Sequence, residues 1–171
     1  MSISITTEEA AARLALRALA DEYAWRTDEY DYDGYAELFT PDAELSSVNP
    51  GETEPFFLAK GTEELRGVVH GNDQFARTFH AVENHRIHHL DLEAGTASGV
   101  IYCTAHHLIE REGEVPQTLI MLIRYHDEYA LTSDGWKFTN RCLRMQWVEY
   151  FDEADVSPYP FRRGSADWMD A

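Results

Sequence analysis

The stretch Thr96–Ile109 reads TASGVIYCTAHHLI, and its length and alternation are typical of a long β-strand with one face toward the core. The odd-numbered positions carry small or apolar side chains and end in a histidine: Ala97, Gly99, Ile101, Cys103, Ala105 and His107. A glycine on the inner face of a strand suits a bend or the close approach of a ligand. The stretch therefore predicts a curved strand that presents His107 on its inner face.

Further strands flank this one. Arg86–Glu93 precedes it across a turn at Ala94-Gly95, and Thr118–Ala130 and Trp136–Tyr150 follow it. Short turns containing glycine separate these segments, so consecutive strands are expected to pair antiparallel. The even-numbered positions of the last strand are predicted to face inward, and they are Phe138, Asn140, Cys142, Arg144 and Gln146.

The N-terminal segment predicts an amphipathic helix. Thr6 and Glu9 have the spacing of a capping box, in which each side chain satisfies a free backbone N–H at the helix start. Apolar residues then recur at helical spacing: Ala12, Leu16, Leu19, Ala20 and Tyr23. Thr27 continues this buried stripe, and Asp28 lies near the end of the helix.

Two shorter helices and two short strands complete the first half of the chain. Asp31 or Asp33 can cap a second helix that Thr40-Pro41-Asp42 stops, and a third helix capped by Thr62 is expected over Thr62–Val69. The short strands are Ala43–Val48 and Phe56–Ala59. Helices followed by long strands predict an α+β fold, with a cone-shaped, strongly curved mixed or antiparallel sheet packed against about three N-terminal helices. We expect a single domain over residues 1–171, with a core at 8–150 and a tail at 151–171.

Composition limits the function. The chain has 171 residues and a formal net charge of −17, which disfavours nucleic acids and anionic membranes as partners. No apolar run is long enough to span a bilayer, and no secretory signal is evident. The two cysteines, Cys103 and Cys142, lie far apart and suggest no disulfide framework. A reducing, cytoplasmic location is expected.

A carboxylate and an imidazole stand out as a candidate catalytic pair. Asp28 ends the segment Tyr23–Asp28, and His80 lies in the segment Thr78–Asn84. A carboxylate bonded to one ring nitrogen fixes the tautomer of a histidine and stabilises the imidazolium that forms when the ring takes a proton. Such a base typically contributes ~10²–10⁴ in rate. The alternative is a core histidine bonded to a nearby backbone group.

Other polar residues have two interpretations each. Tyr23 can donate a hydrogen bond to a substrate oxygen, or it can be a core tyrosine. An inward Arg144 needs an anion, which can be Asp28, a substrate group or a structural partner. The adjacent pairs His88-His89 and His106-His107 lie on predicted strands, so the members of each pair point to opposite faces and cannot hold one metal ion. We expect no metal and no cofactor.

Several spaced motifs together resemble a known family. They are Tyr23-x-x-x-x-Asp28 with Asp31-Tyr32, Leu38-Phe39-x-Pro-Asp-Ala, Thr78-x-His80-x-x-x-Asn84 and Asp134-Gly135-Trp136. The pattern resembles the SnoaL-like branch of the nuclear transport factor 2-like superfamily, and within it the scytalone dehydratases and bile-acid dehydratases. The resemblance implies catalytic roles for Asp28 and His80, with Tyr23, Arg144 and His107 assisting. Ser47 and Thr27 stand where scytalone dehydratase has tyrosines, so the substrate is expected to differ.

The resemblance implies a cofactor-independent lyase, a dehydratase that acts on a small hydrophobic, ring-containing hydroxy-carbonyl compound of steroid or polyketide type. Isomerisation, cyclisation and dehydrochlorination are open alternatives, as is a non-catalytic role like that of a dioxygenase β-subunit. The expected substrate-binding residues are Trp25, Phe79, Phe138, Asn140 and Leu119 or its neighbours.

A homotrimer or homodimer is also implied, packed through the outer sheet face. That face would be apolar if even positions point inward, with Leu119, Met121, Ile123, Leu143, Met145 and Trp147 on it. In the tail, Pro158–Phe161 is expected to cover the mouth of the cone as a lid.

Overall fold

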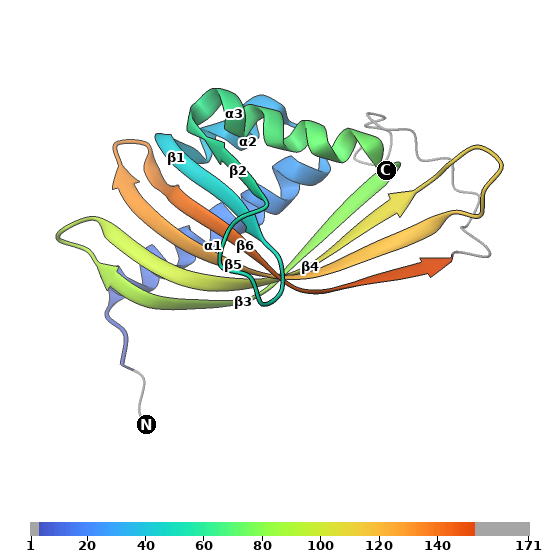
Figure 1. The fold of residues 1–171 in the computed structure, drawn as a ribbon. Coiled ribbons are helices and arrows are strands. Elements are labelled where there is room, and N and C mark those ends of the chain that lie inside the picture. The colour runs from blue at the N-terminus through green and yellow to red at the C-terminus, as the bar shows by residue number, and fades with distance from the viewer. Residues whose placement is uncertain (1–3, 153–171) are drawn as a thin grey trace, which may run out of the picture.

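The computed structural model describes residues 4–152, in which helices cover one side of a curved sheet (Figure 1). The helices are α1 (Thr7–Asp28), α2 (Tyr32–Glu37), α3 (Gly61–Val68) and the 3-10 helix η1 (Val69–Gln74). The strands are β1 (Phe39–Val48), β2 (Phe57–Lys60), β3 (Arg77–Asp91), β4 (Thr96–Ile109), β5 (Gln117–Thr132) and β6 (Gly135–Asp152). The predicted strand Thr96–Ile109 is confirmed as β4.

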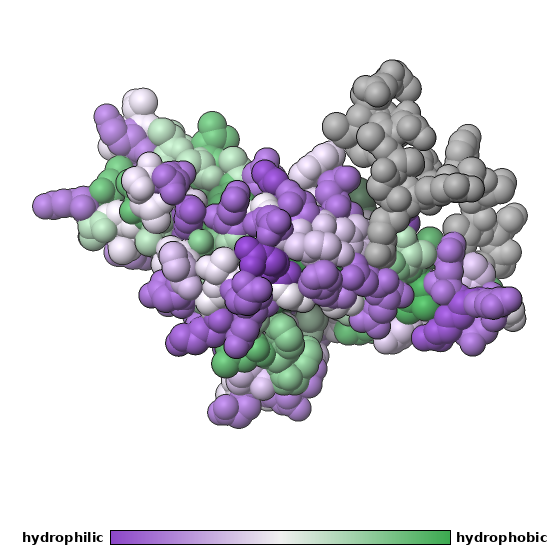
Figure 2. All heavy atoms as spheres, turned by 90° about the horizontal axis from the view of Figure 1, so that it is seen from above, coloured by the Kyte–Doolittle hydropathy of each residue, from purple (hydrophilic) through white to green (hydrophobic). Residues whose placement is uncertain are grey.

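The sheet has six strands in the order β2-β1-β6-β5-β4-β3. Strand β1 runs parallel to β6, and every other neighbouring pair is antiparallel. The sheet curves around the helices without closing into a barrel (Figure 1). The predicted α+β fold with a strongly curved mixed sheet is therefore confirmed. Seen from the helix side, the surface is mostly hydrophilic, with separate hydrophobic areas (Figure 2).

The start and the buried face of α1 follow from its sequence. Thr6 and Glu9 form the predicted capping box, since Glu9 N donates to Thr6 Oγ1 at 3.2 Å and Thr6 N donates to Glu9 Oε2 at 2.9 Å. The apolar stripe is buried and continues to Thr27. The helix ends at Asp28, directly before the turn into α2. Asp31 caps α2 through Gly34 N at 3.0 Å, as predicted.

Several predicted boundaries are wrong. Strand β3 begins at Arg77 rather than at Arg86. Thr40-Pro41-Asp42 does not separate a helix from a strand, because these residues already belong to β1. The pairing of β1 with β6 is interrupted between Phe39 and Glu44. The exposed Pro41, which has no backbone N–H to donate to a neighbouring strand, lies within this interruption. Helix α3 begins at Gly61 after Lys60, with no side-chain cap, so Thr62 is not its cap.

The predicted facing of β6 is wrong beyond Phe138. Phe138 is fully buried, but Tyr129 pairs with Phe138 while Glu128 pairs with Asn140, so β6 carries one extra residue there. This bulge reverses the alternation, and Arg141, Leu143 and Met145 point inward instead of Asn140 and Arg144.

The apolar outer face predicted for an oligomer is also wrong. Leu119, Met121 and Ile123 of β5 lie on the inner face, as do Leu143 and Met145. Trp147 alone of that set is strongly exposed, at 51%. A homotrimer or homodimer stays a prediction, but those residues no longer support it.

Among residues 4–152, no helix is both long and apolar enough to cross a bilayer. The lid predicted at Pro158–Phe161 lies outside the described residues.

A substitution at Gly99 can test how closely β3 packs on β4. A Cβ at Gly99 would lie 2.7 Å from the carbonyl oxygen of Arg86 and 3.3 Å from Cα of Ile87. Because backbone atoms cannot move aside cheaply, we expect Gly99→Ala to destabilise the protein by about 1–3 kcal/mol in urea unfolding.

Gly67→Ala is the matched control, because nothing lies within 4 Å of a Cβ there and alanine favours the interior of α3. Equal stabilities for the two variants would contradict the tight β3–β4 contact.

Candidate active site

Asp28 and His80, which are 52 residues apart in sequence, are in direct contact where the end of α1 meets the edge strand β3. The Asp28 carboxylate accepts three hydrogen bonds. His80 Nδ1 lies 2.7 Å from Oδ1, His80 N donates to Oδ2 at 2.8 Å, and Thr78 Oγ1 donates to Oδ1 at 2.8 Å. The side chains are 8% exposed for His80 and 19% for Asp28. The predicted contact is therefore present in a largely dry setting.

The protonation of the pair follows from its partners. Burial raises the pKa of Asp28, but the hydrogen bond and charge of His80, its backbone N–H and Thr78 outweigh burial and lower that pKa overall. An ionised carboxylate only accepts hydrogen bonds, so Nδ1 of His80 carries a proton. The lone pair of the neutral ring then lies on Nε2, for which residues 4–152 supply no hydrogen-bond partner. His80 is thus arranged to take a proton at Nε2.

His80 forms part of the wall of a cavity of about 300 Å³ between the sheet and the helices. Most of the lining is apolar or aromatic, and a few polar groups point in. The helical part of the lining comes from Tyr23, Thr27, Tyr35, Val68, Val69, Gly71, Asn72 and Gln74. The sheet and the connections to it contribute Leu45, Ser47, Phe56, Phe57, Phe75, His80, His107, Met121, Ile123, Tyr125, Leu143 and Met145.

Tyr23 supplies a hydroxyl at the cavity. It is 4% exposed, and its hydroxyl accepts a hydrogen bond from Tyr35 Oη at 3.3 Å. Burial raises the pKa of Tyr23, although the nearby Arg141 opposes that shift. The hydroxyl therefore keeps its proton and can donate it in a hydrogen bond to an oxygen in the cavity.

A buried ion pair lies behind Tyr23 that sequence analysis missed. Arg141 Nε and Nη2 donate to the two carboxylate oxygens of Asp127 at 2.9 and 2.8 Å, and both side chains are essentially inaccessible. The guanidinium also stacks on the rings of Tyr23 and Phe138, each at 4.0 Å. Asp127 is on the apolar, odd-numbered face of β5, and this placement was the available signal, because a buried carboxylate requires a cation.

His107 also lies beside the pair. Its ring centroid is 5.5 Å from that of His80 and 4.5 Å from that of Phe75. Burial lowers the pKa of His107 to about 4, and the neighbouring His80 lowers it as well. His107 is therefore neutral at physiological pH. Its buried Nδ1 has no partner within the described part of the chain.

Arg144 does not enter the site. The bulge in β6 turns it to the outer sheet face, where it is exposed. Arg141 takes the inward place that Arg144 was predicted to have.

None of the five predicted substrate-binding residues lines the cavity. Trp25 is 46% exposed because it follows Tyr23 by two residues, about 200° around the helix. Phe79 is 65% exposed because it alternates with the inward His80. Phe138 and Leu119 are buried in the core, and Asn140 faces outward with Arg144. The predictions failed where side-chain direction, rather than residue type, decided the outcome.

No group of three or more His, Cys, Asp or Glu side chains is placed to hold a metal ion within residues 4–152.

A model of the SnoaL-like domain matches residues 8–142. The chain belongs to this family. The predicted resemblance is confirmed at that level, and the match covers both members of the Asp28–His80 pair. No curated protein matches the chain significantly in sequence.

Solved structures with the same fold include enzymes. A protein from Novosphingobium aromaticivorans described as a "Putative Scytalone Dehydratase" is 21% identical, with TM-score 0.71 over 90% of this chain and 96% of that one. A hexachlorocyclohexane dehydrochlorinase, LinA type 2, is 19% identical, with TM-score 0.72 over 89% and 97%. LinA-type3 from Novosphingobium barchaimii is 20% identical, with TM-score 0.70 over 87% and 96%. At these identities the likeness establishes the fold.

The low pKa of His107 predicts a pH dependence of stability. Unfolded His107 binds a proton below about pH 6.5, whereas the folded protein resists protonation until about pH 4. Its contribution is fully present above pH 6.5 and is lost as the pH falls toward 4, by about 3 kcal/mol in all.

We therefore expect His107→Gln to lose clearly less unfolding free energy than the parent protein between pH 7 and about pH 4 in urea titrations. The adjacent, outward-facing His106→Gln serves as the control and should retain the dependence of the parent. Identical pH profiles for all three proteins would contradict a buried, neutral His107.

Proposed function

We propose that this protein is a cofactor-independent lyase that removes water from a small, ring-containing hydroxy-carbonyl compound. The observation that carries the proposal is the Asp28–His80 hydrogen bond at the wall of a mostly apolar cavity. A histidine whose Nδ1 is held by a carboxylate presents Nε2 as a base. The SnoaL-like family match and the dehydratase and dehydrochlorinase neighbours support a lyase or isomerase type of enzyme.

The first step is removal of a proton from the carbon next to a carbonyl. His80 Nε2 takes the proton, and the negative charge of Asp28 stabilises the imidazolium that results. The electron pair of the broken C–H bond moves toward the carbonyl oxygen. Tyr23, protonated and buried, can donate a hydrogen bond to that oxygen as charge develops on it.

The second step is loss of the β-hydroxyl. The enolate electrons form the new carbon–carbon double bond as the carbon–oxygen bond breaks. The imidazolium of His80 returns its proton to the departing hydroxide, so that water leaves and the neutral base is restored. His107 lines the same cavity beside His80, and we assign it the role of a hydrogen-bonding partner for the departing oxygen.

The cavity indicates the type of substrate. A volume of about 300 Å³ is at the small end of small-molecule sites, and the aromatic lining suits a planar or ring-shaped compound. Phe56, the last residue before β2, and Phe57, the first residue of β2, are exposed by 57% and 40% and also line the cavity. They supply an apolar entrance for such a compound.

Isomerisation, cyclisation and dehydrochlorination share the first step and differ in the fate of the enolate or carbanion that proton removal creates. A dehydrochlorinase of the same fold makes loss of chloride the best-supported of these alternatives. A non-catalytic subunit would not require a carboxylate–imidazole pair such as Asp28–His80 that is largely buried from solvent beside a cavity.

The shared first step gives a test that does not depend on the leaving group. Ring ketones with and without a β-hydroxyl are incubated with the protein in D₂O, and loss of the α-proton is followed by NMR. Formation of an enone, seen by its ultraviolet absorbance, identifies dehydration. We expect exchange with both kinds of ketone and enone only from the hydroxylated ones. Absence of exchange across the panel, with the protein shown to be folded, would reject the proposal.

Two substitutions test the residues. His80→Ala and Asp28→Asn should each lower the rate of α-proton exchange by ~10²–10⁴, because one removes the base and the other removes the charge that stabilises it. His106→Ala is the control, since His106 neighbours His107 on the opposite face of β4 and should keep the parent rate. If Asp28→Asn is fully active, the chemistry must be carried by other residues.

A further inference from the structure

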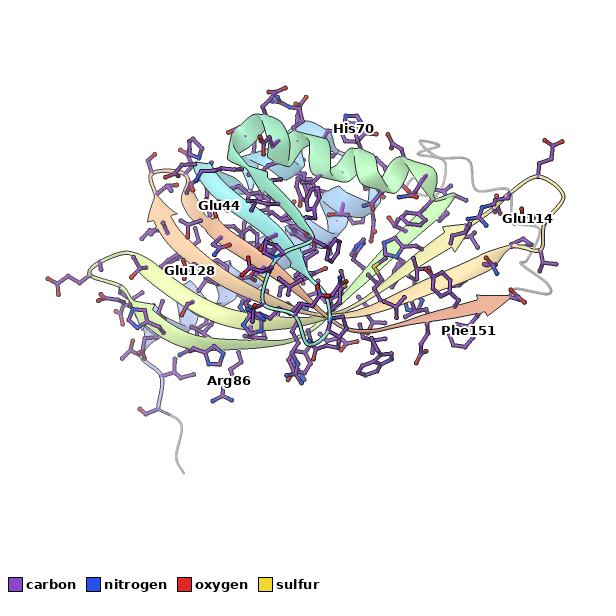
Figure 3. All side chains as sticks on the ribbon, viewed as in Figure 1. Glu44, His70, Arg86, Glu114, Glu128 and Phe151 are labelled. Atoms are coloured by element: carbon purple, nitrogen blue, oxygen red, sulfur yellow. The ribbon has the colours of Figure 1, made fainter. Side chains whose placement is uncertain are left out.

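The outer face of the sheet carries a second hollow, on the side away from the helices. It has a volume of about 510 Å³ and is lined by side chains from β3, β4 and β5: Asn84, Arg86, His88, Val100, Tyr102, Arg124 and His126. Figure 3 shows Arg86 on this side, pointing away from the helices. We call it the outer groove. It shares no lining residue with the cavity that contains His80.

The outer groove is basic on a strongly acidic chain. The protein has 14 Lys and Arg against 31 Asp and Glu, yet the groove lining contains two arginines, two histidines and no acid. Arg144 of β6 adds a third guanidinium, because it lies directly opposite Arg124 in the β5–β6 pairing. Cations gathered in this way create a local positive potential within a negative surface.

These arginines lack the acidic partners that other arginines of this chain have. Arg17, Arg66 and Arg111, for example, each form an ion pair with an Asp or Glu. Within residues 4–152, Arg86, Arg124 and Arg144 form no ion pair. Two acids lie near the ends of this cluster along the strands. Glu128 lies two residues beyond His126 on β5, and Glu83 accepts a hydrogen bond from Thr104 at 2.8 Å.

The arrangement is unfavourable without an anion. Like charges directly opposite each other on neighbouring strands destabilise a sheet. Arg124 is nevertheless held in place, with its guanidinium 4.8 Å from the ring centroid of Tyr102. Burial lowers the pKa of His126, and the charges of Arg144 and Arg124 lower it as well, although the buried Asp127 opposes that shift. A bound anion would relieve this repulsion.

We propose that the outer groove binds a small organic molecule that bears a phosphate group. Guanidinium groups bind phosphate through paired, charge-assisted hydrogen bonds. A phosphate offers more charge and more acceptor oxygens than a carboxylate does to Arg86 and Arg124 in the groove and to Arg144 beside Arg124. The volume is within the range of small-molecule sites. The Tyr102 ring, 36% exposed, provides a flat surface for the organic part. The proposal does not depend on the function proposed for the His80 cavity.

The test measures binding of phenyl phosphate and of inorganic phosphate to the full chain by calorimetry at constant ionic strength. Phenyl phosphate should bind more tightly than inorganic phosphate, because only it can contact Tyr102. Arg124→Gln should weaken binding of phenyl phosphate about tenfold or more. Arg111→Gln, on the β4–β5 turn and paired with Glu114, makes the same change of charge outside the groove and should leave binding unchanged.

Two further measurements check that Arg124→Gln is folded and that phenyl phosphate does not bind in the cavity that contains His80. Without ligand, Arg124→Gln should melt no lower than the parent protein, since the substitution relieves repulsion with Arg144. His80→Ala should retain full affinity for phenyl phosphate.

Several results would overturn the proposal. These are no binding at about 10 mM phenyl phosphate, equal weakening by Arg124→Gln and Arg111→Gln, or loss of binding in His80→Ala. The groove would instead be an interface between copies if Arg124→Gln dissociated an oligomer while neither phosphate bound.

Discussion

The carboxylate of Asp28 joins the helical layer to the free edge of the sheet. It is the last residue of α1, and its three hydrogen bonds all come from Thr78 and His80 on β3, an edge strand with only β4 as a sheet neighbour. The same three donors keep the carboxylate ionised in spite of burial. The group that orients the proposed base therefore also ties the end of α1 to β3, in addition to Arg17, whose guanidinium donates to the carbonyl oxygens of Val82 and Glu83. A substitution at Asp28 is expected to affect both the chemistry and the packing of α1 on β3.

The Arg141–Asp127 pair has a comparable role one layer deeper. A buried ion pair is expensive to form and weak as a source of net stability, but removing one partner leaves a charge without compensation. In this protein the guanidinium stacks on Tyr23, Tyr125 and Phe138 and so fixes the aromatic wall behind the cavity. Tyr129 Oη donates a further hydrogen bond to Asp127 Oδ2 at 2.9 Å. Tyr23 thus presents its hydroxyl from a rigid support.

The sequence predicts best those helices and strands in which the spacing of apolar residues stays regular from end to end. The capping box and apolar stripe of α1, and the alternation along β4, follow from local chemistry and were predicted correctly. Asp28 and His80 could be paired through the family resemblance. The inward residue of β6 could not be predicted, because a single extra residue after Phe138 exchanges Arg144 for Arg141 and no propensity marks that bulge.

The lining of the cavity was missed for a different reason. Phe56 lies in a loop, Phe57 begins the short strand β2, and Asn72 lies in η1. The positions of these segments depend on tertiary contacts rather than on a long repeating pattern. Trp25 and Phe79 were chosen for their residue type, although their neighbours Tyr23 and His80 already occupied the inward positions.

The alternation of β5 has a consequence for how such a chain can change over evolutionary time. Tyr125 and Asp127 face the core, while Arg124 and His126 face the opposite side. Loss or gain of one residue within this strand would exchange the two sets, placing cations in the core and tyrosines in water. Substitutions can accumulate on either face independently, but changes of length are confined to the connections, such as residues 49–56 and 110–116. The first of these contains Phe56 at the cavity, so altered loop length can change which molecules enter while the Asp28–His80 geometry is inherited intact.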